Sequence, residues 1–189
     1  MTYTLRSGET LRVEHLLLGQ QTPADRLGAV CDLIVQPRAP WFSPHERTHV
    51  EGALTGTYAD TARDIFFVGW IGDEPVGNVY YGTAADAPEL GLMAYVITAP
   101  THRQKGVSAI LFEAAMEHFL KTGGVCMHLS TSNPVAHRLY ESGGFRDYQG
   151  YVMRYLRADH EWDTYDRIYF ADAGPAEVRL GHWGDLARI

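Results

Sequence analysis

Cysteine, clusters of basic residues and long apolar runs are all scarce in this sequence, and each scarcity excludes a class of protein. Cys31 and Cys126 are the only cysteines among 189 residues, which makes neither a zinc-ligand pattern nor a disulfide framework. No run of about 18 apolar residues occurs, so no segment is expected to span a membrane. Lys and Arg form no cluster and the net charge is −7, which argues against a general nucleic-acid-binding protein.

The start of the chain also lacks the basic-then-apolar pattern of a secretory signal. Both cysteines lie in apolar surroundings, where we expect reduced, buried thiols, and a cytoplasmic location is therefore predicted. Hydrophobic residues make up 46% of the chain, which is enough for a sizeable core. The length suits one ordinary domain plus an appendage.

Helical and strand periods alternate along the first 156 residues. Start signals such as Ser43-Pro44 followed by Glu46, a capping box, and stop signals such as Gly123-Gly124 separate them. The pattern predicts a strand over 10–18, helices over 22–35 and 44–60, strands over 64–71, 76–82 and 90–98, a helix over 104–121, a strand over 125–130, a helix over 133–142 and a closing strand over 148–156. This order predicts an α/β protein with a mixed sheet.

The segment from Val96 to Ser108 runs from a strand through a turn and a glycine into a helix. The first backbone N–H groups of a helix have no partner within it and carry the positive end of the helix dipole, so they form an anion site. Gly106 lets a phosphate approach the backbone, Ser108 is small, and Arg103 and Lys105 add positive charge. The segment predicts a phosphate site, with a simple turn as the alternative for so short a pattern.

A second pattern lies about 30 residues further along the chain. Asn133, Ala136 and Tyr140 share one face of the helix expected over 133–142. A face that presents an amide, a small side chain and a phenol suits a thin chain such as pantetheine. The alternative for Tyr140 alone is an aromatic residue at the edge of the core.

Together the two patterns resemble the GNAT acetyltransferases. The phosphate loop of that family reads Arg or Gln, two residues, Gly, one residue, and Gly or Ala, so that Arg103 and Gly106 match and Ser108 departs from it. The later helix of the family reads Asn, two residues, Ala, three residues, Tyr, three residues, Gly-Phe. Its fixed positions are matched by Asn133, Ala136, Tyr140, Gly144 and Phe145.

The resemblance covers about residues 10–156 and is strongest over 96–145. It implies the GNAT fold, an α/β architecture whose central mixed, mostly antiparallel twisted sheet is flanked by helices. Residues 1–156 would form the acyltransferase domain and residues 157–189 a C-terminal extension. Residues 176–189 resemble the opening of a further GNAT unit, so the extension is either the start of such a unit or a tail that supports a homodimer.

The resemblance implies transfer of acetyl from acetyl-CoA, without a metal, to a primary amine of a small molecule or peptide by direct attack in a ternary complex. The residues implied to bind the coenzyme are Val96, Ile97, Thr98, Arg103, Gln104, Lys105, Gly106, Val107, Ser108, Asn133, Ala136 and Tyr140. Backbone N–H groups over 96–98 would stabilise the oxyanion, and Tyr140 would protonate the leaving sulfur or donate a hydrogen bond to it.

The general base is less defined by the sequence. Glu89 is the only carboxylate near the strand before the phosphate loop, and His128 on the next strand is a second candidate because imidazole titrates near neutrality. A solvated strand-end carboxylate and a hydrogen-bonded structural histidine are the corresponding alternatives.

The acceptor pocket is expected to involve the first two helices and their linker, which contains Trp41 and Phe42. These aromatic residues, like Tyr80, Tyr81 and Tyr95, suit a pocket or the core equally well. Two other functions stay open on the same scaffold. One is acyl transfer or decarboxylation on a carrier-protein thioester, and the other is a non-catalytic acyl-CoA sensor.

Overall fold

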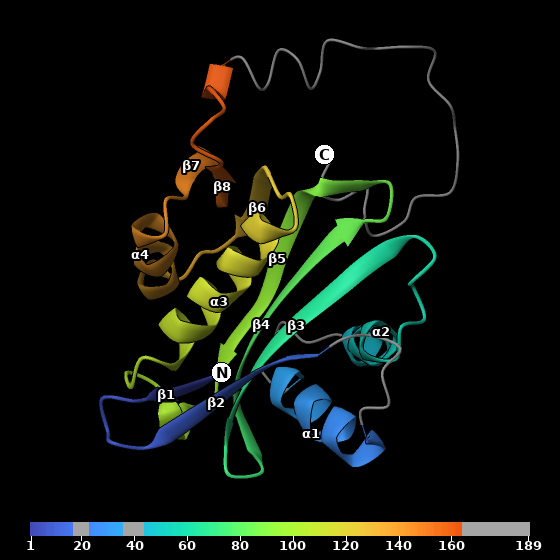
Figure 1. Cartoon of the computed structure of the whole chain (residues 1–189), viewed down its shortest axis with the longest axis vertical. Coiled ribbons are helices and arrows are strands. Elements are labelled where there is room, and N and C mark those ends of the chain that lie inside the picture. Colours follow the sequence, from blue (N-terminus) through green and yellow to red (C-terminus); the bar gives the residue numbers. More distant parts are fainter. Residues whose placement is uncertain (17–22, 36–43, 164–189) are drawn as a thin grey trace.

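A computed structural model describes residues 1–16, 23–35 and 44–163 (Figure 1). The elements in chain order are β1 (Thr2–Thr4), β2 (Thr10–Leu16), α1 (Ala24–Ile34), α2 (Pro44–Leu54), β3 (Ala62–Ile71), β4 (Glu74–Ala84), β5 (Ala87–Thr98), the 3-10 helix η1 (Pro100–His102), α3 (Val107–Lys121), β6 (Cys126–Ser130), α4 (Pro134–Ser142), β7 (Arg146–Gln149) and β8 (Val152–Leu156).

The strands form one eight-stranded sheet in the order β1-β2-β3-β4-β5-β6-β8-β7. Every neighbouring pair is antiparallel except β5 and β6, which are parallel because α3 crosses between them. Helices α1 and α2 cover one face of the twisted sheet, and α3 and α4 cover the other (Figure 1). The predicted mixed, mostly antiparallel sheet flanked by helices is therefore confirmed.

Several predicted boundaries of helices and strands were wrong. The strands were predicted too short because pairing between neighbouring strands extends further than composition suggests. The loops expected over 72–75 and 83–88 shrink to two residues each, since Pro75 pairs with Trp70 and Thr83 pairs with Gly91. The single closing strand is instead the β7–β8 hairpin, and β1 was not predicted at all. The helix expected over 44–60 ends at Leu54, and the helix expected from 104 begins at 107.

Each face of the sheet has its own core. Leu111, Phe112 and Phe119 of α3 pack with Tyr140 and Phe145 on one face, and residues of α1 and α2 pack against Phe66, Val68 and Trp70 on the other. Gly77 of β4 fixes how closely α3 approaches, because a Cβ atom there would lie 2.6 Å from Cγ1 of Val107. The N-terminus of α3 is thus held tightly against the middle of the sheet.

The predicted domain end at residue 156 coincides with the end of β8. Beyond it the structure describes a short stretch to Asp163, where the guanidinium groups of Arg146 and Arg154 lie over the ring of Trp162. The remaining part of the predicted extension, 164–189, lies outside the described residues, as do Ser43 of the capping box and the aromatic pair Trp41 and Phe42. The role of the extension and the homodimer stay predictions.

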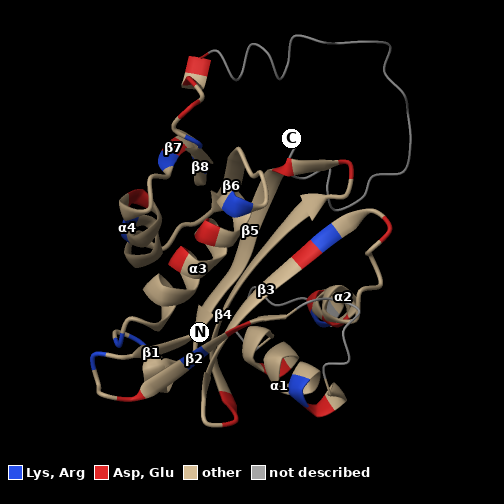
Figure 2. Cartoon of the chain, in the orientation of Figure 1, with Lys and Arg blue, Asp and Glu red and all other residues tan. Residues whose placement is uncertain are grey.

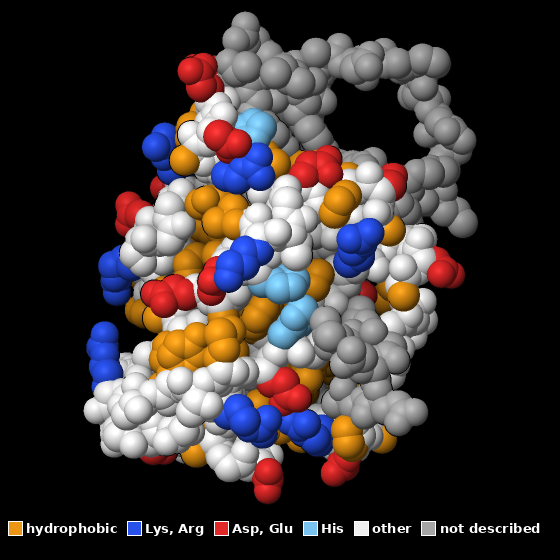
Figure 3. Space-filling view, in the orientation of Figure 1, with side chains coloured by type: hydrophobic (Ala, Val, Ile, Leu, Met, Phe, Trp, Pro, Cys, Tyr) orange, Lys and Arg blue, Asp and Glu red, His pale blue; other side chains and the backbone are white. Residues whose placement is uncertain are grey.

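An aromatic cluster that includes two histidines lies on the α3 face of the sheet, near the end of β2. The imidazole of His15 stacks on Phe67 with ring centroids 4.9 Å apart and meets His118 edge-on at 4.4 Å. The Tyr81 hydroxyl lies 2.6 Å from Nδ1 of His118. Figure 3 shows histidine side chains beside hydrophobic ones in the middle of this face. Burial, helped by the charge of His118, lowers the pKa of His15 to about 4.

We expect acidification to destabilise the protein partly through His15. The pKa of the side chain is near 6.5 in the unfolded chain and near 4 in the folded one, so between these values the unfolded state binds more protons. Stability from His15 is complete above pH 6.5 and is lost as the pH falls towards 4. In His15→Phe, the free energy of unfolding should fall between pH 7 and pH 5 by about 1 kcal/mol less than in the unsubstituted protein, after allowance for partial exposure. Urea denaturation at both pH values measures this, and equal losses in the two proteins would contradict it.

Candidate active site

The junction between β5 and α3 has the backbone geometry of an anion site. Two of its residues have positive φ, Gln104 at 62° and Gly106 at 96°, and Gly106 is the N-cap residue of α3. Backbone that alternates in this way turns consecutive N–H groups towards one side and forms a nest. The first N–H groups of α3 extend it, because a helix start leaves them without intrahelical partners.

A cavity of about 580 Å³ lies over this junction and reaches α4. Its walls are Arg6, Val96, Thr98, His102, Arg103, Gln104, Gly106, Val107, Ser108, Ala109, Asn133, Val135, Ala136 and Leu139. Figure 2 shows basic residues along the loop before α3 and at the nearby β1–β2 turn. One cavity therefore joins the two patterns that the sequence analysis singled out, and its loop end is basic.

Strands β5 and β6 separate beside this cavity. They pair only from Leu90 to Leu92 with Cys126 to His128, although β5 continues to Thr98. In the same stretch β5 bulges, because Tyr95 and Val96 both lie opposite the single residue Val79 of β4. The separation leaves backbone N–H groups of β5 without a partner strand on that side.

The sequence profile of the acetyltransferase (GNAT) family matches residues 27–145. The chain belongs to the GNAT acetyltransferase family. Acyl transfer is the reaction of this family, and acetyl-CoA is its acyl donor.

Solved structures with the same fold are distant in sequence. The GNAT domain of S. lividans PAT is 18% identical, with 82% of this chain and 93% of that chain covered and a TM-score of 0.60. A GNAT-family acetyltransferase from Staphylococcus aureus Mu50 is 9% identical, with 77% and 98% covered and a TM-score of 0.63. The PaiA N-acetyltransferase of Thermoplasma acidophilum, solved in complex with coenzyme A, is 13% identical, with 77% and 99% covered and a TM-score of 0.55. A search of curated proteins finds no match.

Nine of the twelve residues predicted to bind the coenzyme line the cavity of about 580 Å³ over the β5–α3 junction. They are Val96, Thr98, Arg103, Gln104, Gly106, Val107, Ser108, Asn133 and Ala136. Gly106 presents open space at the position where a Cβ atom would stand. The cavity thus leaves the backbone of the loop accessible, as phosphate binding requires.

The other three predicted residues lie beside the cavity rather than on its wall. Ile97 is buried in the core of the α1 and α2 face. Lys105 turns to Glu9, with 2.7 Å between Nζ and Oε2, and this pair lowers the pKa of Glu9. Tyr140 is 5% exposed and packs between Phe112 and Phe145.

Tyr140 is held as a neutral hydrogen-bond donor. Burial raises its pKa to about 12, so the phenol keeps its proton throughout the neutral range. No residue in the described part of the chain hydrogen-bonds its hydroxyl group. Along the chain Tyr140 follows Ala136, which lines the cavity, by about one helical turn.

Ser108, the one departure from the family's loop pattern, has a structural partner. Its Oγ lies 2.6 Å from Oγ1 of Thr98, and Nε of Arg103 donates to the Thr98 carbonyl oxygen at 3.3 Å. These bonds tie the end of β5 to the start of α3. The substitution therefore stiffens the junction without filling the cavity.

Arg6 and His102 are wall residues that the sequence analysis missed. The Arg6 backbone N–H donates to the Lys105 carbonyl oxygen at 3.4 Å, and Glu9 approaches both Lys105 and His102. The short β1–β2 hairpin thus lies against the phosphate loop. Nothing local in the sequence signals a contact across almost 100 positions, and β1 itself was not predicted.

The two candidates for the general base lie away from this cavity. Glu89 is exposed at the beginning of β5, seven residues before Val96, which is roughly 23 Å along an extended strand. His128 is on β6, with its ring edge-on to Tyr148 at 6.0 Å. Neither side chain lines the wall beside Gly106.

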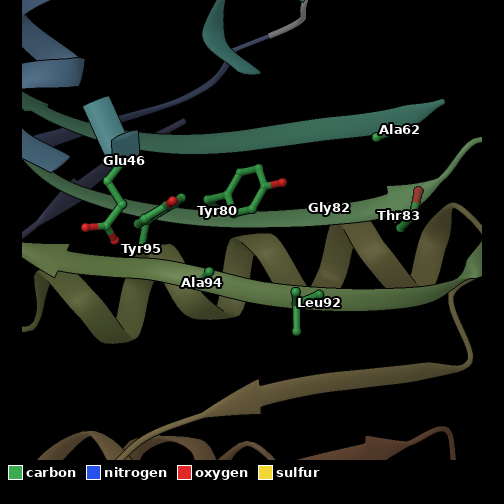
Figure 4. Close-up of a pocket in the computed structure, with 8 residues that line it drawn as sticks. All are labelled: Glu46, Ala62, Tyr80, Gly82, Thr83, Leu92, Ala94 and Tyr95. Carbon is green, nitrogen blue, oxygen red and sulfur yellow. The ribbon is translucent and has the colours of Figure 1, made fainter. Parts of the chain in front are cut away.

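A second cavity, of about 230 Å³, lies on the opposite face of the sheet beneath α2 (Figure 4). Tyr80 and Tyr95 line it, whereas Tyr81 faces α3 and contacts His118. Of the three tyrosines that suited a pocket or the core equally well by sequence, two therefore line this cavity and one lies in the core.

The described residues contain no group of three or more His, Cys, Asp or Glu side chains placed to hold a metal ion.

The longest helix in this part of the chain has 15 residues, and none has both the length and the apolar character of a membrane span.

Proposed function

We propose that this GNAT protein transfers an acetyl group from acetyl-CoA to a primary amine by direct attack in a ternary complex. The observation that carries the proposal is the single cavity of about 580 Å³ that joins the loop from Arg103 to Ser108 with Asn133 and Ala136 of α4. A basic, nest-like end and a wall of Asn133, Ala136 and Leu139 at the α4 end match a ligand with phosphates at one end and a thin amide chain at the other.

The wall fits acetyl-CoA on three counts. Main-chain N–H groups at Gly106, Val107 and Ser108 would hold the diphosphate, with Arg103 supplying charge. Arg6 is placed to meet a further phosphate at the outer edge of the same loop. Asn133 caps α4 through its Oδ1, which accepts from the Val135 N–H at 2.9 Å, and its amide nitrogen is left to face the amides of the pantetheine chain.

Acetyl-CoA supplies the acetyl group as a thioester: the acceptor nitrogen forms the C–N bond while the C–S bond breaks, and the amine loses one proton as the thiol gains one. The chain's part is to orient the reactants and to stabilise charge. Backbone N–H groups near the β5 bulge would stabilise the developing oxyanion. Asn78 fixes that bulge, because its buried Nδ2 donates to the Tyr95 carbonyl oxygen at 2.9 Å.

Tyr140 is the proton donor to the leaving sulfur in this proposal. The phenol, whose pKa burial raises to about 12, stays protonated between the rings of Phe112 and Phe145 and donates a hydrogen bond to the developing thiolate; any proton that it passes to the sulfur is replaced from water. Glu89 is too far along β5 to receive the amine proton directly, so in this scheme the proton leaves through water.

A thiol-release assay with acetyl-CoA and no carrier protein tests the proposal. Amines, aminoglycosides, amino acids and peptide N-termini serve as acceptors, and the product is identified by mass. We expect acetylation of at least one amine that increases linearly with enzyme. Tight binding of acetyl-CoA with no turnover on any acceptor would overturn the transferase proposal in favour of a sensor, and turnover only with a carrier-bound thioester would overturn the choice of donor.

A further inference from the structure

The cavity beneath α2 has a small, mostly apolar interior with one carboxylate at its mouth (Figure 4). It is lined by Glu46, Ala62, Tyr80, Gly82, Thr83, Leu92, Ala94 and Tyr95. Its volume of about 230 Å³ is below the ~300–1,000 Å³ of pockets that hold drug-sized ligands. The space therefore suits a compact molecule.

Glu46 is the charged group of this cavity. Figure 4 shows its side chain descending from α2 beside Tyr95. Among the described residues Glu46 has no ion-pair or hydrogen-bond partner, whereas its neighbour Arg47 binds Asp32 at 2.9 Å and Glu51 at 2.8 Å. A carboxylate beside a tyrosine ring, at a cavity lined mainly by apolar side chains, favours a positively charged ligand.

Two tyrosine rings form the aromatic wall. Tyr80 and Tyr95 lie with ring centroids 5.6 Å apart, and the Tyr80 hydroxyl donates to Oδ1 of Asp64 at 2.6 Å, which fixes that ring. Burial, and after it the nearby Glu46 carboxylate, raises the pKa of Tyr95 to about 12, so its ring is neutral. Neutral aromatic faces attract cations and pack against flat or aliphatic groups.

The β5 bulge lies between this cavity and the cavity of about 580 Å³ on the other face of the sheet, which is proposed to bind the coenzyme. Tyr95 has a φ of 48°, an uncommon conformation for a tyrosine, and it projects towards α2. The next residue, Val96, lines the larger cavity on the other face. Since adjacent residues of one strand face the two cavities, a ligand beneath α2 lies next to the strand where the thioester is expected.

We propose that this cavity binds the acceptor, and that the acceptor is a small primary amine with a hydrocarbon or aromatic body and no carboxylate beside the amine. Glu46 binds the ammonium group, which loses one proton to water before the nitrogen attacks, and Tyr80 and Tyr95 enclose the body. The assignment rests on the proposed function for its chemistry, but the binding site is testable without turnover. It disfavours free amino acids, because their carboxylate would meet Glu46 with like charge.

Phenethylamine and phenylalanine are matched probes, since they differ only in the α-carboxylate. We expect acetylation of phenethylamine with kcat/KM about 100-fold above that of phenylalanine. In Glu46→Gln the KM for phenethylamine should rise about 10- to 100-fold, as for loss of a charged hydrogen bond, while the Kd for acetyl-CoA stays unchanged. Glu51→Gln, on the same helix but at the surface, should keep the parent KM.

Binding of the two probes to the CoA-loaded protein, followed by ligand-detected NMR, separates the two proposals. Phenethylamine that binds the parent protein but not Glu46→Gln supports the acceptor site even if no transfer is seen, in which case only the proposed function fails. Turnover of phenethylamine that is indifferent to Glu46→Gln, or a preference for phenylalanine, overturns the acceptor site and leaves the proposed function intact.

Discussion

Gly106→Val is expected to weaken acetyl-CoA binding by about 100-fold, equivalent to ~2.7 kcal/mol. Gly106 has a φ of 96°, which a β-branched residue adopts only with strain of about 1–3 kcal/mol. No atom lies within 4 Å of the position of a Cβ atom there, so the valine side chain would stand in the space that the diphosphate must enter. Both effects act on the loop backbone that is proposed to hold the phosphates. Isothermal titration with acetyl-CoA measures the loss.

Gly123→Val is a matched control at the other end of the same helix. Gly123 has a φ of 95°, and a Cβ atom there would likewise have no neighbour within 4 Å, but this glycine follows the C-terminus of α3. Both variants should lose similar stability in urea, about 1–2 kcal/mol, and only Gly106→Val should lose affinity. Equal affinities for acetyl-CoA in the two variants would move the phosphate site away from the 103–108 loop.

Tyr140→Phe is expected to lower kcat by about 100-fold, the lower range for loss of a positioned acid. The fold should be preserved, because the ring packs against Phe112 and Phe145 and its hydroxyl has no partner in the described part of the chain. The Kd for acetyl-CoA should change by less than about twofold, since little ground-state binding is removed. Steady-state kinetics together with titration separates the two quantities.

Tyr155→Phe supplies the comparison for Tyr140. Tyr155 also contacts Phe145, with ring centroids 5.7 Å apart, but it lies on β8 and does not line the cavity that reaches α4. This variant should keep the parent kcat. A Tyr140→Phe enzyme with full turnover would remove the phenol from the mechanism and leave it a core residue.

The donor half of the site was predictable because it is local in sequence. A strand, a turn, Gly106 and a helix start follow one another within about a dozen residues, and the α4 face repeats at helical spacing. Such patterns depend on backbone geometry that neighbours along the chain determine. Two features there are visible only in the fold: the bond between Ser108 and Thr98, which closes across the turn, and the positions of Arg6 and His102 on the cavity wall.

The proposed acceptor site was predicted only in outline, at the first two helices with Tyr80 and Tyr95 as candidates, because distant segments build it. Glu46 was assigned to a helix-start capping box, and only the fold shows its side chain beside Tyr95 of β5 (Figure 4). Arg6 reaches the phosphate loop through a hairpin whose first strand is three residues long. Two strand boundaries were also predicted wrongly, since pairing with a neighbouring strand, rather than composition, decides where β4 ends and where β5 begins.

At the bulge formed by Tyr95 and Val96, strand β5 alone separates the cavity beneath α2 from the cavity beside α3. The coenzyme side depends largely on main-chain geometry, whereas the side beneath α2 depends on individual side chains. Under the two proposals, changes on α2 would alter which amine binds and would leave the coenzyme site unchanged. A bisubstrate inhibitor would need a linker that passes the edge of β5 where β5 and β6 separate, because the strand itself lies between its two halves.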